Sequence, residues 1–239
     1  MKTNKNKDNE GSIFTILREL PLIKGVSQTR LQHIAGHVPL HFIKYAAGDV
    51  IADAGQECTH LKFIVSGSVR VEIVAANGRF SVAQTLAGPN VLAPDYLFGR
   101  TNRYPGTATA VGPVGVMQIT KDVYRSMLAE DPVFMFNYLN VLSTAAQKGQ
   151  AALAEAASGS VEQKIACWVQ GMTQPGSTDI VMCSHGRDMN TLLGVAKASY
   201  VAMIERLKAQ RIVEADSLRT IKIISRQELL DSLTAYSGN

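Results

Sequence analysis

The chain has 239 residues, 46% of them apolar and 18% charged, and a net charge of +4. These values predict two small domains with real cores and exclude an intrinsically disordered protein. So small a net charge neither requires nor excludes a nucleic acid partner, and any basic surface must be local.

No apolar run approaches the roughly 20 residues that cross a bilayer, and the polar N-terminus lacks the apolar segment of a signal peptide. Cys58, Cys167 and Cys183 follow no metal or disulfide spacing, which indicates reduced thiols in a cytoplasmic protein with no membrane partner.

The N-terminal part predicts two short helices. One spans residues 12–20, and the second carries Leu31 and Ile34 on its apolar side. His33 and His37 are four residues apart and would share a helix face, as metal ligands can. The helix should end near them, however, and no neighbouring carboxylate or cysteine completes a ligand set. The sequence therefore predicts no metal site, and the identity of any cofactor stays unknown.

From His41 the apolar pattern changes to a period of two, which is typical of β-strands. Asn77 and Gly78 lie between two such runs and form a strong hairpin signal. Many short strands at regular spacing predict a β-sandwich or a small barrel, and such a barrel can hold one small ligand. The runs are HFIKY, DVIA, HLKFIV, SVRVEIV, FSVAQTLA, TATAV and VGVMQI.

A long helix follows the predicted barrel. Asp131 and Pro132 are a capping carboxylate and a first-turn proline, and the helix can continue to about Ala157. A stripe of apolar or small residues follows the alternating three- and four-residue steps of a heptad: Met135, Tyr138, Leu142, Ala145, Gly149, Ala152 and Ala156. Such a stripe pairs with a second copy of the helix or packs on the chain's own barrel, and the pattern favours pairing.

Residues 188–213 predict two helices around a tight turn at Gly194, after an earlier helix that Ser160 and Gln163 begin with a capping box. The second helix opens at Ala196, and between residues 196 and 211 the chain has four basic residues against one acid. Its apolar side chains recur at three- and four-residue spacing as one buried stripe: Tyr200, Met203, Ile204 and Leu207.

Two predicted strands follow this helix pair. They cover residues 212–214 and 219–223, around a turn at residues 215–217. A short helix, a glycine turn, a basic second helix and a wing form the winged helix-turn-helix, whose second helix can enter a DNA major groove. The alternative is an ordinary helical hairpin, which the wing disfavours.

A family resemblance rests on several of these motifs. The segment AAGDVIADAGQECTHLKFIVSGSVRVEI, followed by a hairpin, by VGVMQI and by a helix, resembles the cyclic-nucleotide-binding jelly-roll of the CRP/FNR superfamily of bacterial transcription regulators. Gly48, Gly55 and Gly67 stand where that family turns between strands, and the resemblance covers about residues 12–230. It implies an α+β chain with an effector domain at residues 12–130, a dimerisation helix at 131–157 and a winged helix-turn-helix domain at 158–239.

The resemblance also implies partners. In this family the helix after the barrel is the dimer seam, so we expect a homodimer. A two-fold symmetric dimer binds double-stranded DNA at a near-palindromic site whose half-sites lie about 34 Å apart. RNA polymerase is the further partner that the resemblance implies.

The expected cyclic AMP site departs from the family pattern. In members that bind cyclic AMP, a Gly-Glu pair and an Arg-Ser pair supply amide donors, a carboxylate and a cation. Here Ala93-Pro94 and Tyr104-Pro105 occupy these positions, and proline removes an amide donor. A buried phosphate without a paired cation is costly, so we do not expect control by cyclic AMP.

Two further positions bear on the same pocket, since Gly149 and Gln150 stand where a threonine and a serine of the family reach the adenine base. Asp95 and Arg103 could supply the missing carboxylate and cation only if the loop slips by a residue. The candidate effector pocket therefore consists of Leu86, Asp95, Tyr96, Arg103, Tyr104, Gly149 and Gln150.

The candidate DNA contacts also differ from the best-known family pattern. Lys197, Ala198 and Ala202 take the places of an Arg-Glu pair and a later arginine on the recognition helix. Lys197 can still reach guanine or phosphate, whereas alanine can contact only a thymine methyl group, so the DNA target must be unusual. The candidate DNA-binding residues are Arg187, Lys197, Ser199, Ala202 and Arg206.

The motifs bear on three classes of function: a transcription regulator, a sensor and an enzyme. The motifs favour a dimeric transcription regulator. The alternative is a small-molecule or redox sensor that uses the same barrel and binds DNA weakly or only with its effector. Oxidation of Cys58 would serve such a sensor, but an inert thiol is favoured because no neighbouring base or second cysteine is evident. No Ser/His/Asp set, metal cluster or Gly-rich phosphate loop is present, so we do not expect an enzyme.

Overall fold

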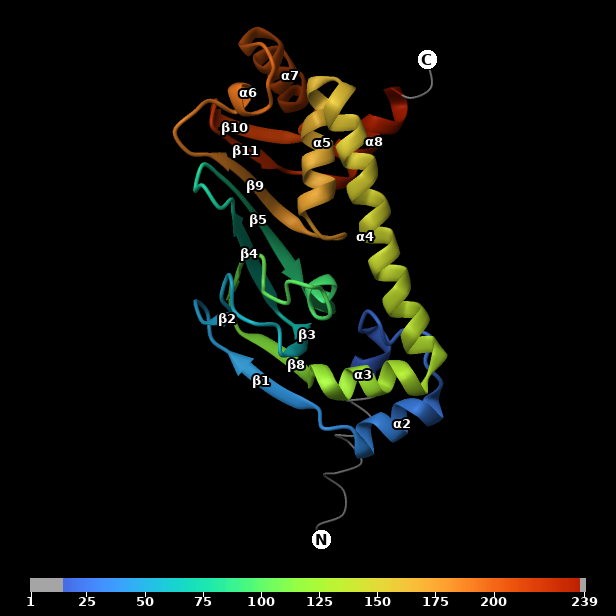
Figure 1. The fold of residues 1–239 in the computed structure, drawn as a ribbon. Coiled ribbons are helices and arrows are strands. Elements are labelled where there is room, and N and C mark those ends of the chain that lie inside the picture. Colours follow the sequence, from blue (N-terminus) through green and yellow to red (C-terminus); the bar gives the residue numbers. More distant parts are fainter. Residues whose placement is uncertain (1–14, 237–239) are drawn as a thin grey trace. The chain divides into compact units, whose positions relative to one another are not determined.

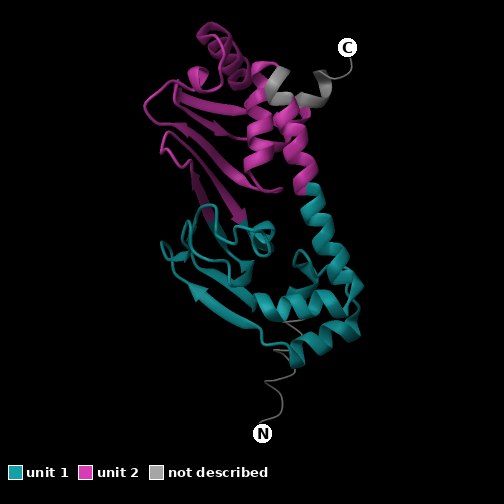
Figure 2. Ribbon diagram, viewed as in Figure 1, with its two compact units in different colours: residues 1–69, 87–144 teal, residues 70–86, 145–239 magenta. Residues whose placement is uncertain are grey.

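The computed structural model describes residues 15–236, with the side chains of residues 155–158 and 232–236 outside that description (Figure 1). The described chain divides into two compact units (Figure 2). Unit 1 contains residues 15–69 and 87–144, and unit 2 contains residues 70–86 and 145–236. These units differ from the three predicted domains, because residues 70–86 associate with the C-terminal part of the chain. The predicted boundaries between effector domain, dimerisation helix and DNA-binding domain, at residues 130 and 157, therefore remain a prediction.

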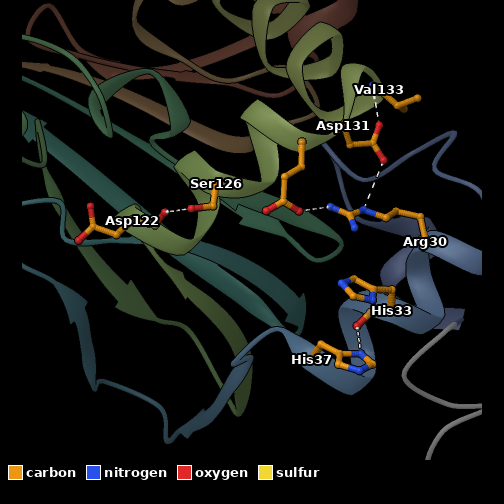
Figure 3. A network of polar contacts seen from close by, with 8 residues as sticks. Arg30, His33, His37, Asp122, Ser126, Asp131 and Val133 are labelled. Atoms are coloured by element: carbon orange, nitrogen blue, oxygen red, sulfur yellow. Dashed lines mark hydrogen bonds and ion pairs between the residues drawn. The ribbon is translucent and has the colours of Figure 1, made fainter.

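The first helices of unit 1 agree with the sequence where they are described. Residues 15–19 are helical, and residues 12–14 of the predicted helix lie outside the described part. Helix α2 spans Gln28–His37 and ends at the predicted place. The rings of His33 and His37 stack with their centroids 4.5 Å apart, and Nδ1 of His37 lies 3.1 Å from the carbonyl oxygen of His33 (Figure 3).

Five of the seven predicted strand runs form strands of unit 1, and the other two form the β4–β5 hairpin of unit 2. One sheet has the order β1-β8-β3-β6, and separately β2 pairs with β7. Buried side chains of the four-stranded sheet include Phe63, Met117 and Ile119, each 0% exposed, so the period-two pattern of apolar residues did identify a core. The strands are β1 His41–Tyr45, β2 Val50–Ala52, β3 His60–Ser66, β6 Asn90–Leu92, β7 Thr107–Ala110 and β8 Val114–Thr120.

Gly67 shows why the turn from β3 into the next strand requires glycine. Its φ angle is +81°, in the left-handed region that L side chains rarely adopt. A Cβ atom at this position would also lie 2.3 Å from the carbonyl oxygen of Pro113. Any other residue would therefore strain the backbone and collide with the neighbouring segment.

Two helices follow the strands, α3 at Lys121–Glu130 and α4 at Pro132–Ser158. The carboxylate of Asp131 accepts a hydrogen bond of 2.8 Å from the amide of Val133, which confirms the predicted helix start. The guanidinium of Arg30 on α2 lies 2.9 Å from Glu130 and 3.5 Å from Asp131, so one cation joins α2 to the boundary between α3 and α4 (Figure 3).

The predicted heptad stripe of α4 is wrong at two positions. Tyr138 is buried within unit 1, where it packs against Phe98 and Tyr124. Ala152 is buried within unit 2 beside Gly171. The protomer itself therefore covers these two side chains, and Ala156 lies outside the described side chains. Four exposed apolar or small residues of α4 lie on a neighbouring stripe with the half-buried Leu142: Met135, Leu139, Ala146 and Leu153. Other exposed residues of this kind, such as Val133 and Phe136, lie outside that stripe.

Unit 2 is built on a sheet with the order β10-β11-β9-β5-β4. The hairpin β4–β5 turns at Asn77 and Gly78, as predicted, and Phe80 to Ala83 of β5 pair with Ser184 to Val181 of β9. The strands are β4 Ser68–Val74, β5 Phe80–Ala87, β9 Thr178–Ser184, β10 Val213–Ser217 and β11 Thr220–Ile223. The helices are α5 Val161–Met172, α6 Met189–Leu192, α7 Lys197–Ala209 and α8 Arg226–Tyr236.

One apolar core holds the elements of unit 2 together. Ile165 of α5, Met182 of β9 and Ile221 of β11 are each 0% exposed, and Tyr200 of α7 is 1% exposed. The capping box of Ser160 and Gln163 begins α5 as predicted. No helix in the described part of the chain is long and apolar enough to span a membrane.

Candidate functional site

The predicted helix-turn-helix is present in unit 2. Gly194, at a φ angle of +66°, makes the turn between α6 and α7, and the side-chain amide of Asn190 donates to the carbonyl oxygen of Val195 at 3.2 Å. The predicted stripe of α7 is buried in the core. Its opposite face is therefore available to a partner.

All five candidate DNA-binding residues have exposed side chains. Ser199, Ala202 and Arg206 lie on α7 away from its buried stripe. Lys197 is the first residue of α7, seven residues before the buried Ile204, and Arg187 lies in the loop between β9 and α6. The wing is also present, although its first strand continues to Ser217, so the turn falls later than predicted. Residues 215–217, where the turn was predicted, belong to β10, whose pairing with β11 shifts register between Glu214 and Ser217.

Internal ion pairs reduce the positive charge that α7 presents. Lys197 Nζ lies 3.9 Å from Asp188, and Lys208 Nζ lies 3.1 Å from Glu205. The guanidinium of Arg206 contacts the carboxylate of Glu162 on α5, which is only 7% exposed. A nearly buried carboxylate needs a partner far more than an exposed one does, so Arg206 has a structural task besides any contact with DNA.

Unit 1 contains residues 93–105, the segment that the sequence resemblance aligns with a cyclic phosphate site. Ala93 has a left-handed backbone, with a φ angle of +43°, and leads into the short helix η1 at Pro94–Tyr96. The carbonyl oxygen of Pro94 accepts a buried hydrogen bond of 2.8 Å from the hydroxyl of Tyr138. This carbonyl oxygen is a hydrogen-bond acceptor that Tyr138 already satisfies, whereas a phosphate group would require hydrogen-bond donors.

Two charged groups of this region, the exposed Asp95 and the half-buried Lys62, have shifted pKa values. Burial raises the pKa of the Asp95 carboxyl and lowers the pKa of the Lys62 ammonium. Lys62 donates to the carbonyl oxygen of Ile51 at 2.6 Å and lies 5.9 Å from the ring centre of Tyr104. Arg103 is exposed and donates to the carbonyl oxygen of Gly55 at 2.8 Å, so the residue slip considered from the sequence would have to break this bond.

The candidate effector residues do not fall in one unit. Four of them, Asp95, Tyr96, Arg103 and Tyr104, belong to unit 1. Leu86, Gly149 and Gln150 belong to unit 2, where Leu86 is 0% exposed. Gly149 alone among the seven lines a cavity of unit 2 that Phe80 and Trp168 also line.

Sequence reasoning missed two features. Lys62 is a cation among the apolar side chains of β3, and the run HLKFIV does contain this signal as a charge between Leu61 and Phe63. The other is the contact of Phe80 with Trp168 in unit 2. No local pattern could have indicated it, because the two residues come from distant parts of the chain.

Comparison with known proteins identifies the fold. Residues 42–131 match the family model of the cyclic nucleotide-binding domain. The sensor domain of the transcriptional regulator DNR from Pseudomonas aeruginosa is similar with a TM-score of 0.50 and 20% identity, covering 57% of this chain and 90% of that chain. The catabolite activator protein of Thermus thermophilus is similar with a TM-score of 0.51 and 15% identity, covering 89% and 99%. A search of curated proteins found no match. The chain therefore contains a region of the cyclic nucleotide-binding type and has a fold of the CRP/FNR type, as its sequence resemblance predicted.

Proposed function

We propose that the protein is a homodimeric transcription regulator of the CRP/FNR type that binds DNA and is not controlled by cyclic AMP. The observation that carries the proposal is the winged helix-turn-helix of unit 2, whose α7 buries one face and leaves the other exposed. The two similar structures are those of the sensor domain of a transcriptional regulator and of a catabolite activator protein, which supports the same role. This function involves no catalysis.

The dimer would form through α4. Leu139 and Leu153 on its exposed stripe are 45% and 76% exposed, so the stripe presents large apolar side chains to solvent. Pairing of the stripe with a second copy would remove both from water. A two-fold dimer would then place two α7 helices on successive major grooves of a near-palindromic site, with half-sites about 34 Å apart. RNA polymerase would be the further partner of the bound dimer.

Independence from cyclic AMP is supported by the chemistry of residues 93–105. Pro94 lacks an amide hydrogen, Tyr104 stands where the binding chemistry needs a cation, and Arg103 is bound to Gly55. A cyclic phosphate entering unit 1 would lose its hydration and gain too few donors. We therefore expect titration calorimetry of the dimer with cyclic AMP to give no heat of binding, and micromolar binding would overturn this part of the proposal.

A second function is favoured by one observation. The ion pairs of Lys197, Arg206 and Lys208 neutralise much of the charge on α7. The alternative is therefore a small-molecule or redox sensor with weak or effector-dependent DNA binding.

Selection of bound sequences from random or genomic DNA tests the two functions. The regulator should enrich one near-palindromic sequence and bind it at least a thousandfold more tightly than random DNA at physiological salt. The alternative predicts no enriched sequence in the absence of an effector. Its binding should have a steep salt dependence and no sequence preference.

A further inference from the structure

The β4–β5 hairpin brings a cation to the segment that leads into the helix-turn-helix. Arg79 lies in the turn of the hairpin, directly before Phe80, which pairs with Ser184 at the end of β9 (Figure 1). The carbonyl oxygen of Arg79 accepts a hydrogen bond of 2.8 Å from the amide of His185. The amide of Arg79 donates to the side-chain oxygen of Asn77 at 3.0 Å. The backbone that carries the Arg79 side chain is therefore held on both sides.

Arg187 is a neighbour of Arg79 within unit 2. Its carbonyl oxygen accepts a hydrogen bond of 2.8 Å from the hydroxyl of Ser184, and it directly precedes Asp188, the N-cap residue of α6. Arg79 and Arg187 both border the same cavity of unit 2. Two segments far apart in the sequence thus place two arginines together at the entry of the helix-turn-helix.

These two arginines keep the positive charge that the cations of α7 partly lose. Both are exposed, and among the described residues neither guanidinium has an ion pair. Asp188 follows Arg187 directly, but its carboxylate pairs with Lys197 and Arg219. The charge of Arg79 and Arg187 is therefore available to an anionic partner.

The entry of a helix-turn-helix is a place where the DNA backbone passes. The first helix of the motif crosses the backbone while the second helix enters the major groove. Each strand of DNA carries one phosphate charge for about every 3.4 Å of helix axis, so neighbouring cations meet neighbouring phosphates. The planar donors of a guanidinium group match phosphate oxygens. DNA phosphate is thus the partner that suits both the position and the chemistry of Arg79.

We propose that Arg79 is a DNA phosphate contact that the β4–β5 hairpin supplies, in addition to the five candidate DNA-binding residues. This assignment rests on the proposed function, since it requires α6 and α7 to dock on DNA. It extends the DNA interface to residues 70–86, which the sequence resemblance placed in the effector domain. A displacement of the hairpin would then change DNA affinity directly, without any change in α7.

Fluorescence anisotropy of the full-length protein at several salt concentrations tests this contact, with the selected near-palindromic duplex and an unrelated duplex. Arg79→Gln should weaken both duplexes alike, about fivefold for each lost contact at physiological salt, and should lower the salt slope by about 0.9 per contact. Arg79→Lys keeps the charge and should retain most of that slope. The matched control is Ala76→Gln, at an exposed position of the same hairpin, which should change neither quantity.

Uncharged methylphosphonate linkages in the duplex locate the contacted phosphate. A linkage at that phosphate should weaken the wild-type protein and leave Arg79→Gln unaffected, because the variant has already lost the contact. Both hydrogen bonds of Arg79 with Asn77 and His185 come from its backbone, so the substitution keeps them. Emission of Trp168 at the wild-type wavelength verifies that the hairpin of the variant stays in place.

The results separate this assignment from the proposed function. If the wild-type protein selects one DNA sequence and Arg79→Gln keeps its affinity and salt slope, the assignment of Arg79 is wrong and the proposed function stands. A wild-type protein that binds no DNA would overturn both. Weaker binding of the selected duplex alone would also overturn the assignment, because a phosphate contact affects every sequence alike.

Discussion

The ring of Phe80 meets Trp168 edge to face, with the ring centres 5.2 Å apart and the planes 75° apart. Phe80 begins β5 and Trp168 belongs to α5, so this contact attaches the β4–β5 hairpin to the helix that precedes β9. Backbone pairing of β5 with β9 strengthens the same attachment. The hairpin is therefore an integral part of unit 2.

Replacing Phe80 should loosen the hairpin. We expect Phe80→Ala to lower the free energy of unfolding by about 2 kcal/mol and to shift the emission of Trp168 to longer wavelength, because water reaches the indole ring. Phe80→Leu should cost about half as much, since it keeps apolar volume. Urea denaturation followed by fluorescence measures both effects. Phe42→Ala, at a side chain 50% exposed on β1, is the control, and an unshifted emission in Phe80→Ala would contradict the docking of the hairpin.

The proposed seam makes a prediction about oligomeric state. The double substitution Leu139→Asp and Leu142→Asp places two charges on the exposed stripe of α4, so we expect monomers in analytical ultracentrifugation and the loss of specific DNA binding. The control is Asn140→Asp, an exposed position on the same helix outside that stripe. A dimer that survives the double substitution would show that the seam lies elsewhere.

Lys197 tests the DNA-facing side of α7. If its ammonium reads a base, Lys197→Ala should relax the sequence preference at one position of the selected site. If it contacts a phosphate, the substitution should weaken all sequences alike and reduce the salt slope by about 0.9. Lys44→Ala, at an exposed lysine of β1, should do neither. The interface would be misplaced if Lys197→Ala matched this control in both assays.

Arg206 should matter for stability as well as for DNA. Arg206→Gln leaves the nearly buried carboxylate of Glu162 without its cation, so we expect a loss of about 1–3 kcal/mol in urea denaturation. Adding Glu162→Gln should restore part of that loss, because no unpaired charge then remains. Lys208→Gln breaks only an exposed pair and should cost less than about 1 kcal/mol. Equal costs for Arg206→Gln and Lys208→Gln would show that the buried carboxylate does not need Arg206.

Cys58 should behave as an inert thiol at neutral pH. Burial raises its pKa to about 11, so only about 0.1% of it is thiolate at pH 8. We expect iodoacetamide to alkylate it far more slowly than the half-exposed Cys183, with a rate that rises as the pH approaches 11. The folded protein favours the neutral thiol of Cys58, so this group's contribution to the free energy of unfolding is complete below about pH 9, its ordinary pKa, and declines above it. Peptide mass spectrometry measures the labelling, and faster labelling of Cys58 would favour the redox sensor.

Local patterns determined much of this protein. The hairpin at Asn77 and Gly78, the start of α4 at Asp131 and the capping box at Ser160 all follow from hydrogen bonds within a few residues. The period of the apolar residues likewise gave the buried stripe of α7, including Tyr200, because a helix that packs on a core must bury one face.

The tertiary structure decided which partner each surface meets. Tyr138 and Ala152 fit the heptad pattern of α4, yet the protomer buries both, because periodicity shows that a face is apolar without showing what covers it. The pairing of Arg206 with Glu162 and the cavity beside Phe80 and Trp168 arise from segments far apart in the chain. Such contacts depend on how the elements pack together, and no local pattern in the sequence records that packing.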